Sequence, residues 1–500
     1  MASPAPAPPP APNETTELMP KEADQAAQPE ESMTWTQWLQ GPGKWTRWIF
    51  WICFAQGIST LANALPGCAA NYVMPDLNLT DSQFGTAMGL SYELPFAIGS
   101  IIFALAVGGG LPVRPHYLLV MCCVITNLGS TLVGTAQSFG TLCLWRAVTG
   151  IGMIAMFPAF GALFEEICPP GFVGAAWSVF LGFITLGASA ANFVVGGLCE
   201  TLGWRNSIFV FGILGMAAGL VLLVFPPPPP STRVHVGWAN FRPFRMPAAE
   251  NKLSLNECLC RAPVVAPTLP ILALAGLFID VQGGSWATYG QLWLVDERNM
   301  TITRAANTSG WALIGGCLIG IFLALMVVDR MKARFNLVRP YVLAIALLFI
   351  LPFDIMATSS SPDTAWFYIG FFSCFMQATL GLGQMFACVQ ELSPPRIVGT
   401  TTAVIQFVNR IGNTGGSFIG GYVVDALRDG GSNDPYTWVL RIGYFSTIVT
   451  ILSAIWAAPS FEAGKAALYE LIGTAPDEDD ANADDVEKTE QEPPAKDDWY

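Results

Sequence analysis

Residues 391–427 begin with Glu391-Leu-Ser-Pro-Pro-Arg-Ile-Val-Gly-Thr400 and continue into a long apolar segment. Moved back by 225 positions, this stretch aligns without a gap on residues 166–202, which begin with Glu166-Ile-Cys-Pro-Pro-Gly-Phe-Val-Gly-Ala175. The residues that coincide are Glu166/Glu391, Pro169/Pro394, Pro170/Pro395, Gly174/Gly399, Gly187/Gly412, Phe193/Phe418, Gly196/Gly421 and Leu202/Leu427. Two segments that follow the same Glu-x-x-Pro-Pro turn, half a chain apart, predict a duplicated unit.

The composition is typical of a membrane protein. Of the 500 residues, 52% are hydrophobic and 12% are charged, whereas a soluble domain carries about 25% charged residues. Apolar runs recur along the chain, and a helical run of about twenty residues crosses the hydrocarbon core of a bilayer. We therefore predict an all-α, multi-pass membrane protein, and we expect no nucleic-acid partner.

The apolar runs fall into two groups of six. The first six spans are predicted near 48–70, 84–108, 117–136, 140–164, 172–197 and 204–225, and the second six near 265–288, 308–328, 340–358, 364–389, 397–424 and 437–458. Between the groups lies Pro226–Pro230, and five prolines cannot continue a helix. We therefore predict a six-helix bundle over 47–225, a central linker over 226–263 and a second six-helix bundle over 264–459.

The acidity of the chain belongs to its two ends. Of the net charge of −13, residues 1–32 contribute −5 and residues 476–500 contribute −9, so the part between them is close to neutral. Segments rich in Pro, Ala, Glu and Asp cannot bury enough apolar surface to fold. We predict a disordered arm with an interfacial segment over 1–46 and an acidic disordered tail over 460–500.

Basic residues occupy alternate loops, which predicts the orientation in the membrane. They lie before the first span, after the second, in the linker and after the eighth, and the positive-inside rule assigns such loops to the cytoplasm. Both termini are then cytoplasmic. The glycosylation sequons at Asn78, Asn299 and Asn307 fall on or beside the opposite side. We expect the plasma membrane rather than an endomembrane, and a monomer.

Four charged residues inside predicted spans need a physical reason: Glu93, Arg146, Asp280 and Arg410. A charge at mid-bilayer costs at least a few kcal/mol, so it usually faces a cavity or a partner. Arg146 can clamp a carboxylate or phosphate through two parallel hydrogen bonds, or it can bond to nearby carbonyls. Glu93 or Asp280 can carry a proton. The alternatives are a fixed ion pair for Glu93 and a polar residue near the mouth for Asp280.

Amide side chains lie along one face of two of the later predicted spans. In the eleventh span, Gln406, Arg410 and Asn413 share a helix face, as do Asn409 and Asn413. In the tenth span, Gln377 and Gln384 lie two turns apart on one face. Such stripes line a water-filled path or tie helices together, and the sequence leaves both roles open. As candidate solute-binding residues we take these amides together with Arg146 and Arg410.

Several chemistries find no support in the sequence. No Gly-x-x-x-x-Gly-Lys-Ser/Thr loop is present, so ATP-driven transport is not indicated. No convergent set of nucleophile, base and acid indicates an enzyme. Cys258-Leu-Cys260 lacks the spacing of a zinc site. We expect no enzyme activity, no cofactor and no metal.

Over roughly residues 46–460 the chain resembles the major facilitator superfamily. The resemblance rests on the 6+6 repeat, the long inner linker, Arg146-x-x-x-Gly150-x-Gly152 in the fourth span, and Asp329-Arg330-x-x-x-Arg334 after the eighth. The matching site after the second span reads Gly108-Gly-Gly-Leu-Pro-Val-Arg114-Pro and lacks the Asp-Arg pair. The Glu-x-x-Pro-Pro turn is similar to that of spinster-type and organic-anion carriers.

This resemblance implies an alternating-access carrier, a secondary active transporter (symporter or antiporter), that binds a small organic solute between its two halves. It also implies that spans 2 and 11 touch, so Glu93 and Arg410 are expected to pair. Glu93, Asp280, Asp329 and Arg330 are the expected coupling or gating residues. An anionic solute and proton coupling are both left open. The alternatives are an uncoupled facilitative carrier or drug exporter, or a membrane receptor that keeps this fold without transporting.

Overall fold

The structure is a computed structural model that describes residues 44–108, 115–154, 156–157, 159–160, 173–223, 261–323, 338–393 and 398–472. From Trp48 onward the chain belongs to one unit. Most of the predicted arm, linker and tail, and both Pro-Pro pairs of the repeated turn, lie outside the described residues.

The described part of the first half consists of helices that coincide with the first six predicted spans. They are α2 (Lys44–Cys68), α3 (Ala70–Leu77), α4 (Asp81–Gly85), the π-helix η1 (Thr86–Leu90), α5 (Ser91–Gly108), α6 (Pro115–Val133), α7 (Phe139–Met153), α9 (Val173–Gly197), α10 (Cys199–Leu202) and α11 (Trp204–Val221). The second predicted span is thus built from three consecutive segments, α4, η1 and α5.

The second half repeats this pattern. Its helices are α13 (Thr268–Leu292), the π-helix η3 (Trp293–Glu297), α14 (Ile302–Leu323), α16 (Arg339–Ser359), α17 (Ala365–Met376), the π-helix η5 (Gln377–Gly381), α18 (Leu382–Leu392), α19 (Val398–Asp429) and α20 (Pro435–Ala457). A short 3-10 turn, η6 (Ala458–Ser460), leads into α21 (Phe461–Ile472). Each of the last six predicted spans overlaps one or more of these helices.

Many of these helices are suited to a bilayer. Within the described ranges, seven helices are long and apolar enough to cross a membrane, and two shorter apolar helices cover 117–133 and 365–376. The lipid-compatible faces are visible in the exposed apolar side chains, such as Phe445 and Leu452 on α20. The chain is an integral, multi-pass membrane protein, while the count of twelve crossings stays a prediction.

The sequence repeat reappears as a structural repeat. The two copies of the repeated apolar segment lie in helices α9 and α19. Both carry a repeat glycine at a close helix crossing. A Cβ on Gly187 would lie 2.1 Å from the carbonyl oxygen of Gly57, and one on Gly412 would lie 2.0 Å from that of Leu277. The paired glycines therefore let the fifth and eleventh spans approach the first and seventh.

We predict that Gly412→Ala destabilises the protein, because its Cβ would overlap a backbone carbonyl that cannot swing away like a side chain. Overpacking of this kind costs about 1–3 kcal/mol. The matched control is Gly415→Ala on the same helix, where a Cβ meets nothing within 4 Å. The apparent unfolding temperature of the purified protein should fall for the first variant and hold for the second. Equal unfolding temperatures would contradict the tight crossing.

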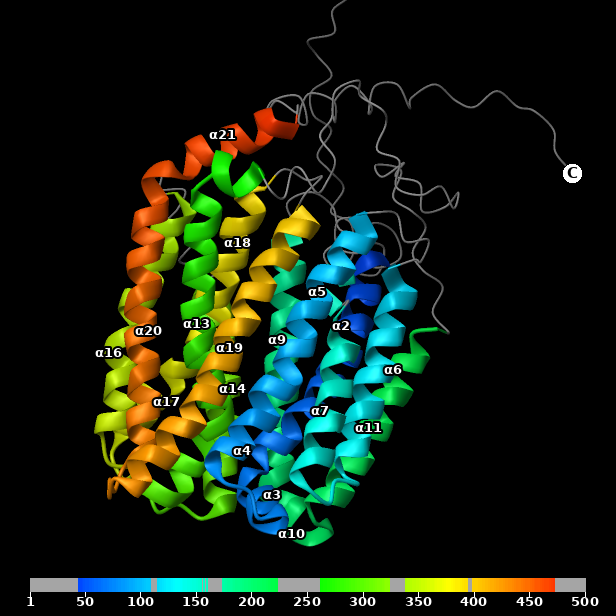
Figure 1. The fold of residues 1–500 in the computed structure, drawn as a ribbon, viewed down its shortest axis with the longest axis vertical. Helices are drawn as coiled ribbons and strands as arrows, with labels where there is room; N and C mark the ends of the chain where they lie inside the picture. The colour runs from blue at the N-terminus through cyan, green and yellow to red at the C-terminus, as the bar shows by residue number, and fades with distance from the viewer. Residues whose placement is uncertain are drawn as a thin grey trace, which may run out of the picture. The chain divides into compact units, whose positions relative to one another are not determined.

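The two halves meet along two pairs of helices. Helix α5 packs against α19, and α9 packs against α14; Figure 1 shows α5 and α19 side by side where the blue and orange helices meet. On the second seam the Ser189 hydroxyl donates to the Gly310 carbonyl at 2.7 Å. Contacts within each half are supplied by pairs such as α6 with α11 and α13 with α20. A solute path between the halves would run between these two seams.

The start of the tail differs from the sequence prediction. The composition predicts disorder over 460–500, yet Phe461–Ile472 form helix α21. Phe461 and Leu468 are fully buried in a cluster with Leu272 and Leu392. Figure 1 shows α21 lying across the helix ends, and it contacts α13 and α18. Phe461 and Leu468 lie two helical turns apart and therefore share a face, which is the signal for this helix.

Candidate functional site

A cavity of about 420 Å³ lies between the two halves. The first half contributes wall residues from α2, η1, α5, α7 and α9, and the second from α13, α14, α17, η5, α18 and α19. Two of the three π-helical turns in the described residues, η1 with Met88 and η5 with Gln377, reach this wall. Such turns are frequent at functional sites because they redirect side chains within a helix.

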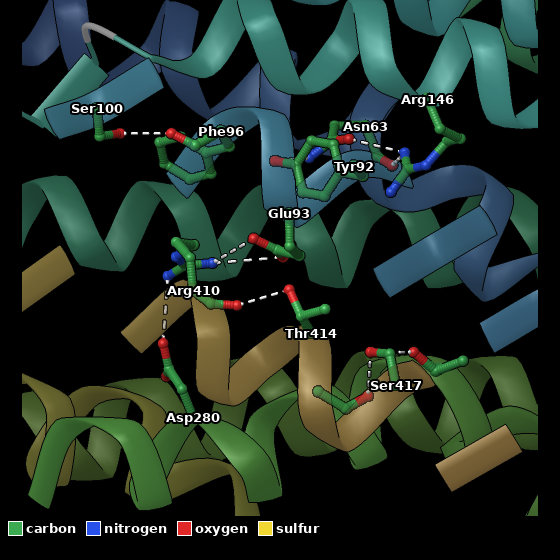
Figure 2. A network of polar contacts seen from close by, with 12 residues as sticks. Asn63, Tyr92, Glu93, Phe96, Ser100, Arg146, Asp280, Arg410, Thr414 and Ser417 are labelled. Carbon is green, nitrogen blue, oxygen red and sulfur yellow. Dashed lines mark hydrogen bonds and ion pairs between the residues drawn. The ribbon is translucent and has the colours of Figure 1, made fainter. Parts of the chain in front are cut away.

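The predicted charged residues meet at this cavity. Arg410 Nη1 of α19 lies 3.4 Å from Glu93 Oε2 of α5, and Arg410 Nη2 lies 3.6 Å from Asp280 Oδ2 of α13. Figure 2 shows the arginine between the two carboxylates. Their side chains are only 15%, 6% and 6% exposed. The predicted pairing of Glu93 with Arg410 is therefore present.

One cation serves two acids in this cluster. The Arg410 guanidinium also lies 5.3 Å from the centre of the Phe96 ring, while its Nε has no hydrogen-bond partner. Because spans 2, 7 and 11 each supply one member, the cluster links the first half to the second. Protonation of either carboxyl, or arrival of an anion, would change the balance of charge across that junction.

Arg146 stands in a different environment. Its Nη1 donates to the Asn63 backbone carbonyl at 3.0 Å and to Asn63 Oδ1 at 2.9 Å, and its guanidinium stacks 4.4 Å from the centre of the Tyr92 ring. Asn63 Nδ2 in turn donates to the Tyr92 hydroxyl at 2.8 Å (Figure 2). Arg146 still lines the cavity, and its Nε is unbonded. Both predicted roles, carbonyl anchoring and solute contact, are compatible with this position.

The predicted amides divide into two sets. Gln377 and Asn413 line the cavity, whereas Gln384, Gln406 and Asn409 are buried elsewhere. Gln384 Oε1 accepts a hydrogen bond from Arg339 Nη1 at 3.2 Å, beside the ion pair of Arg339 with Glu391. The helix-face spacing could not separate these sets, because a stripe on one helix gives no information on which neighbouring helix covers it.

The predicted gating pair Asp329 and Arg330 lies outside the described residues. Sequence reasoning also missed Asn63, Tyr92 and Asp354. Tyr92 adjoins Glu93, so its ring was predictable only once its partner on α7 was known. Asp354 lies inside the predicted ninth span, and its charge was a signal equal to that of the other four charged residues within spans.

Two further sets of contacts join the halves. Toward the predicted outer end, Arg428 pairs with Asp81, and the Tyr436 hydroxyl donates to Asp81 Oδ1 at 2.7 Å. Toward the other end, Phe386 of α18 stacks on Phe157 and Trp177, with ring centroids 6.1 and 6.2 Å apart.

Comparison with known proteins places these features in a family. A model described as Major Facilitator Superfamily matches residues 52–417. The chain is 25% identical over 371 residues to an MFS-type efflux pump of Mycolicibacterium smegmatis, covering 73% of this chain and 81% of that protein. It is 27% identical over 219 residues to the 4-hydroxybenzoate transporter PcaK of Acinetobacter baylyi, covering 41% and 46%.

Solved structures give a similar result for the fold. A bacterial homolog of the human lysosomal transporter Spinster, in an inward-facing and unoccupied conformation, matches with a TM-score of 0.59 and 18% identity, over 86% of this chain and 98% of that one. The nucleoside transporter NupG matches with a TM-score of 0.59 and 13% identity, over 81% and 99%. At this identity the matches show a shared fold.

Proposed function

This chain belongs to the major facilitator superfamily, a family of membrane transporters rather than enzymes, and we propose that it is a secondary active transporter for a small organic anion. The solute would bind in the cavity between the halves, which would rock about it to open each side in turn. Proton coupling would use Glu93 and Asp280.

The single observation that carries the anion assignment is the state of Arg146. It lines the cavity and is buried, and its hydrogen bonds go to the neutral Asn63; Glu93 acts on it through a longer-range charge interaction, not through a direct ion pair. A buried guanidinium that no carboxylate bonds directly attracts an anion, and it binds a carboxylate or phosphate through parallel hydrogen bonds.

The rest of the wall favours a solute with an apolar or aromatic body. Trp286, Phe371 and Phe375 line the cavity, with the Trp286 ring centroid 5.6 Å from that of Phe371. Gln377 and Asn413 add polar groups that can orient a bound molecule. The similarity to a 4-hydroxybenzoate transporter agrees with an aromatic carboxylate, although only part of each chain is covered.

Proton coupling would follow from the shared cation. Glu93 and Asp280 both form ion pairs with Arg410, so two buried carboxylates share one directly bonded guanidinium. A proton on either acid would free part of the guanidinium for the anion, so binding of the proton and binding of the anion would favour each other.

We place both termini on the cytoplasmic side of the plasma membrane, from the distribution of basic loops, and propose a monomer.

A binding screen tests the anion assignment directly. Benzoate and 4-hydroxybenzoate would be compared with benzamide and 4-hydroxybenzamide, which keep the ring and lose the charge, while hexose phosphates and nucleosides would widen the panel. A ligand of the native state raises the apparent unfolding temperature of the purified protein. We expect the carboxylates to raise it and the amides to leave it unchanged. Equal shifts for acid and amide, or a shift with nucleosides alone, would contradict an anion site.

An uncoupled exporter of apolar compounds is the second candidate, favoured by the aromatic wall and by the similarity to an efflux pump. It differs from the first candidate in its response to a pH gradient. In proteoliposomes, exchange of labelled solute that ignores the gradient would indicate this carrier. Solute binding without any flux would indicate a receptor.

A further inference from the structure

A further buried acid, Asp354 of α16, has no part in the proposed transport mechanism. Its side chain is fully buried, at 0% exposure. Oδ2 accepts a hydrogen bond from Gln282 Nε2 at 3.0 Å, whereas Oδ1 has no hydrogen-bond partner. A buried carboxylate in its charged form normally fills both oxygens with donors or a cation.

No cation compensates this carboxyl among the described residues. The titratable groups that face it are the Cys374 thiol of α17, which hydrogen-bonds to it, and the Tyr444 hydroxyl of α20. Arg298 donates instead to the Thr358 carbonyl, and Arg441 stacks on Trp438 with its guanidinium carbon 5.8 Å from the ring centre.

The other elements packed against α16 do not supply a cation for Asp354 either. The segments η5 and η6 have no titratable side chain, and Glu391 of α18 pairs with Arg339 at the first residue of α16. Asp280 of α13 forms its ion pair with Arg410. Asp354 thus differs from Glu93 and Asp280, which share a guanidinium.

The surrounding hydrogen bonds form a chain in which each side chain donates to the next, and Asp354 is the last acceptor. Gln377 Nε2 donates to Thr447 Oγ1 at 3.3 Å, the Thr447 hydroxyl donates to Gln282 Oε1, and Gln282 Nε2 donates to Asp354. With Gln282 fixed in this orientation, its oxygen is occupied and its nitrogen points at the acid. Asp354 receives one amide donor and the weak donor of the Cys374 thiol. Neither donor is a cation, so a proton on the carboxyl completes a neutral carboxylic acid.

The same chain reaches the solute cavity. Gln282, Cys374 and Gln377 all line it, so one layer of side chains separates the cavity from Asp354. We propose that Asp354 is a proton-binding site of the second half, neutral in this conformation, that exchanges its proton with the cavity past Gln282 and Cys374. This inference rests on the proposed transport function and adds a proton site to the Glu93–Arg410–Asp280 cluster.

Protonation can be measured without any solute. The full-length protein would be reconstituted in lipid vesicles, and the infrared band of protonated carboxyl groups would be recorded near neutral pH for the wild type and for Asp354→Asn. Asparagine mimics the neutral acid, so the variant should fold. The control is Asp363→Asn, which changes an acid whose side chain is 85% exposed. We expect the first variant to lose a band component that the wild type and the control keep.

Two results would overturn the proposal. One is an unchanged protonated-carboxyl band in Asp354→Asn. The other is an unfolding temperature that rises with NaCl, compared with choline chloride, in the wild type but not in Asp354→Asn, because a metal cation would then occupy the site. If the band behaves as expected and no solute is transported, the proton site stands and the proposed transport function fails. If a pH gradient drives solute uptake but the band is unchanged, the proposed transport function stands and the proton site at Asp354 fails.

Discussion

Arg410→Gln should abolish solute transport and lower the apparent unfolding temperature, the largest effect expected of any single change in the cavity. The substitution leaves Glu93 and Asp280 buried without their shared cation, which lies 3.4 and 3.6 Å away in the wild type. Removing one partner of a buried ion pair costs about 3–5 kcal/mol. Flux in proteoliposomes and thermal unfolding of the same preparation would measure both effects. Arg304→Gln, at a half-exposed arginine on α14, is the matched control and should be close to neutral.

Double variants separate pairing from simple loss of charge. Exchanging the charges, with Glu93→Arg and Arg410→Glu together, should restore part of the transport that each single variant loses. The rescue should be partial, because the exchange places a carboxylate beside Asp280. Adding Asp280→Asn to the exchange should increase the recovered transport, because it removes the second carboxylate. No recovery in either combination, at normal expression, would count against a functional pair.

Arg146→Gln should weaken binding of an anionic solute by roughly 10–100-fold, because a charge-assisted hydrogen bond contributes about 1.5–3 kcal/mol and each 1.4 kcal/mol is tenfold. Arg146→Lys should recover only part of the affinity, since an ammonium keeps the charge without the planar fork. The measurement is the apparent dissociation constant for benzoate from thermal shift, with benzamide as the uncharged probe.

Asn63→Asp offers a test that keeps Arg146 in place. Asn63 Oδ1 already accepts from Arg146 Nη1 at 2.9 Å, so an aspartate there would supply a directly bonded counter-ion with little change in shape. We expect binding of the anion to weaken while the protein becomes no less stable. A variant that binds benzoate as tightly as the wild type would show that Arg146 acts only as an anchor for α2.

The fold could be predicted well from the sequence because its signals are long and periodic. The 225-residue repeat makes Gly187 and Gly412 equivalent positions, and both lie at close helix crossings. Helix α21 was missed because the predicted tail was extended back to residue 460, although its run of acidic residues begins only at Asp477, after the helix.

The site was predicted in part, and the misses have a common cause. Mid-membrane charge identified Glu93, Arg410 and Asp280, which do meet. Helix periodicity alone grouped Gln406 and Asn409 with Asn413, although only Asn413 reaches the cavity. Which face of a helix is covered depends on neighbours that are distant in sequence, so contacts across α5, α13 and α19 could not be read from any one of them.

Uptake of an aromatic carboxylate into proteoliposomes under an imposed pH gradient tests the central claim most directly. Vesicles with wild-type protein would be compared with Arg410→Gln vesicles, using labelled benzoate or the best binder of the screen and correcting for passive entry in protein-free vesicles. The account predicts protein-dependent flux that follows the proton gradient, collapses when a protonophore dissipates it, and is absent in the variant. Gradient-driven flux that persists in Arg410→Gln, or tight binding with no flux in the wild type, would contradict it.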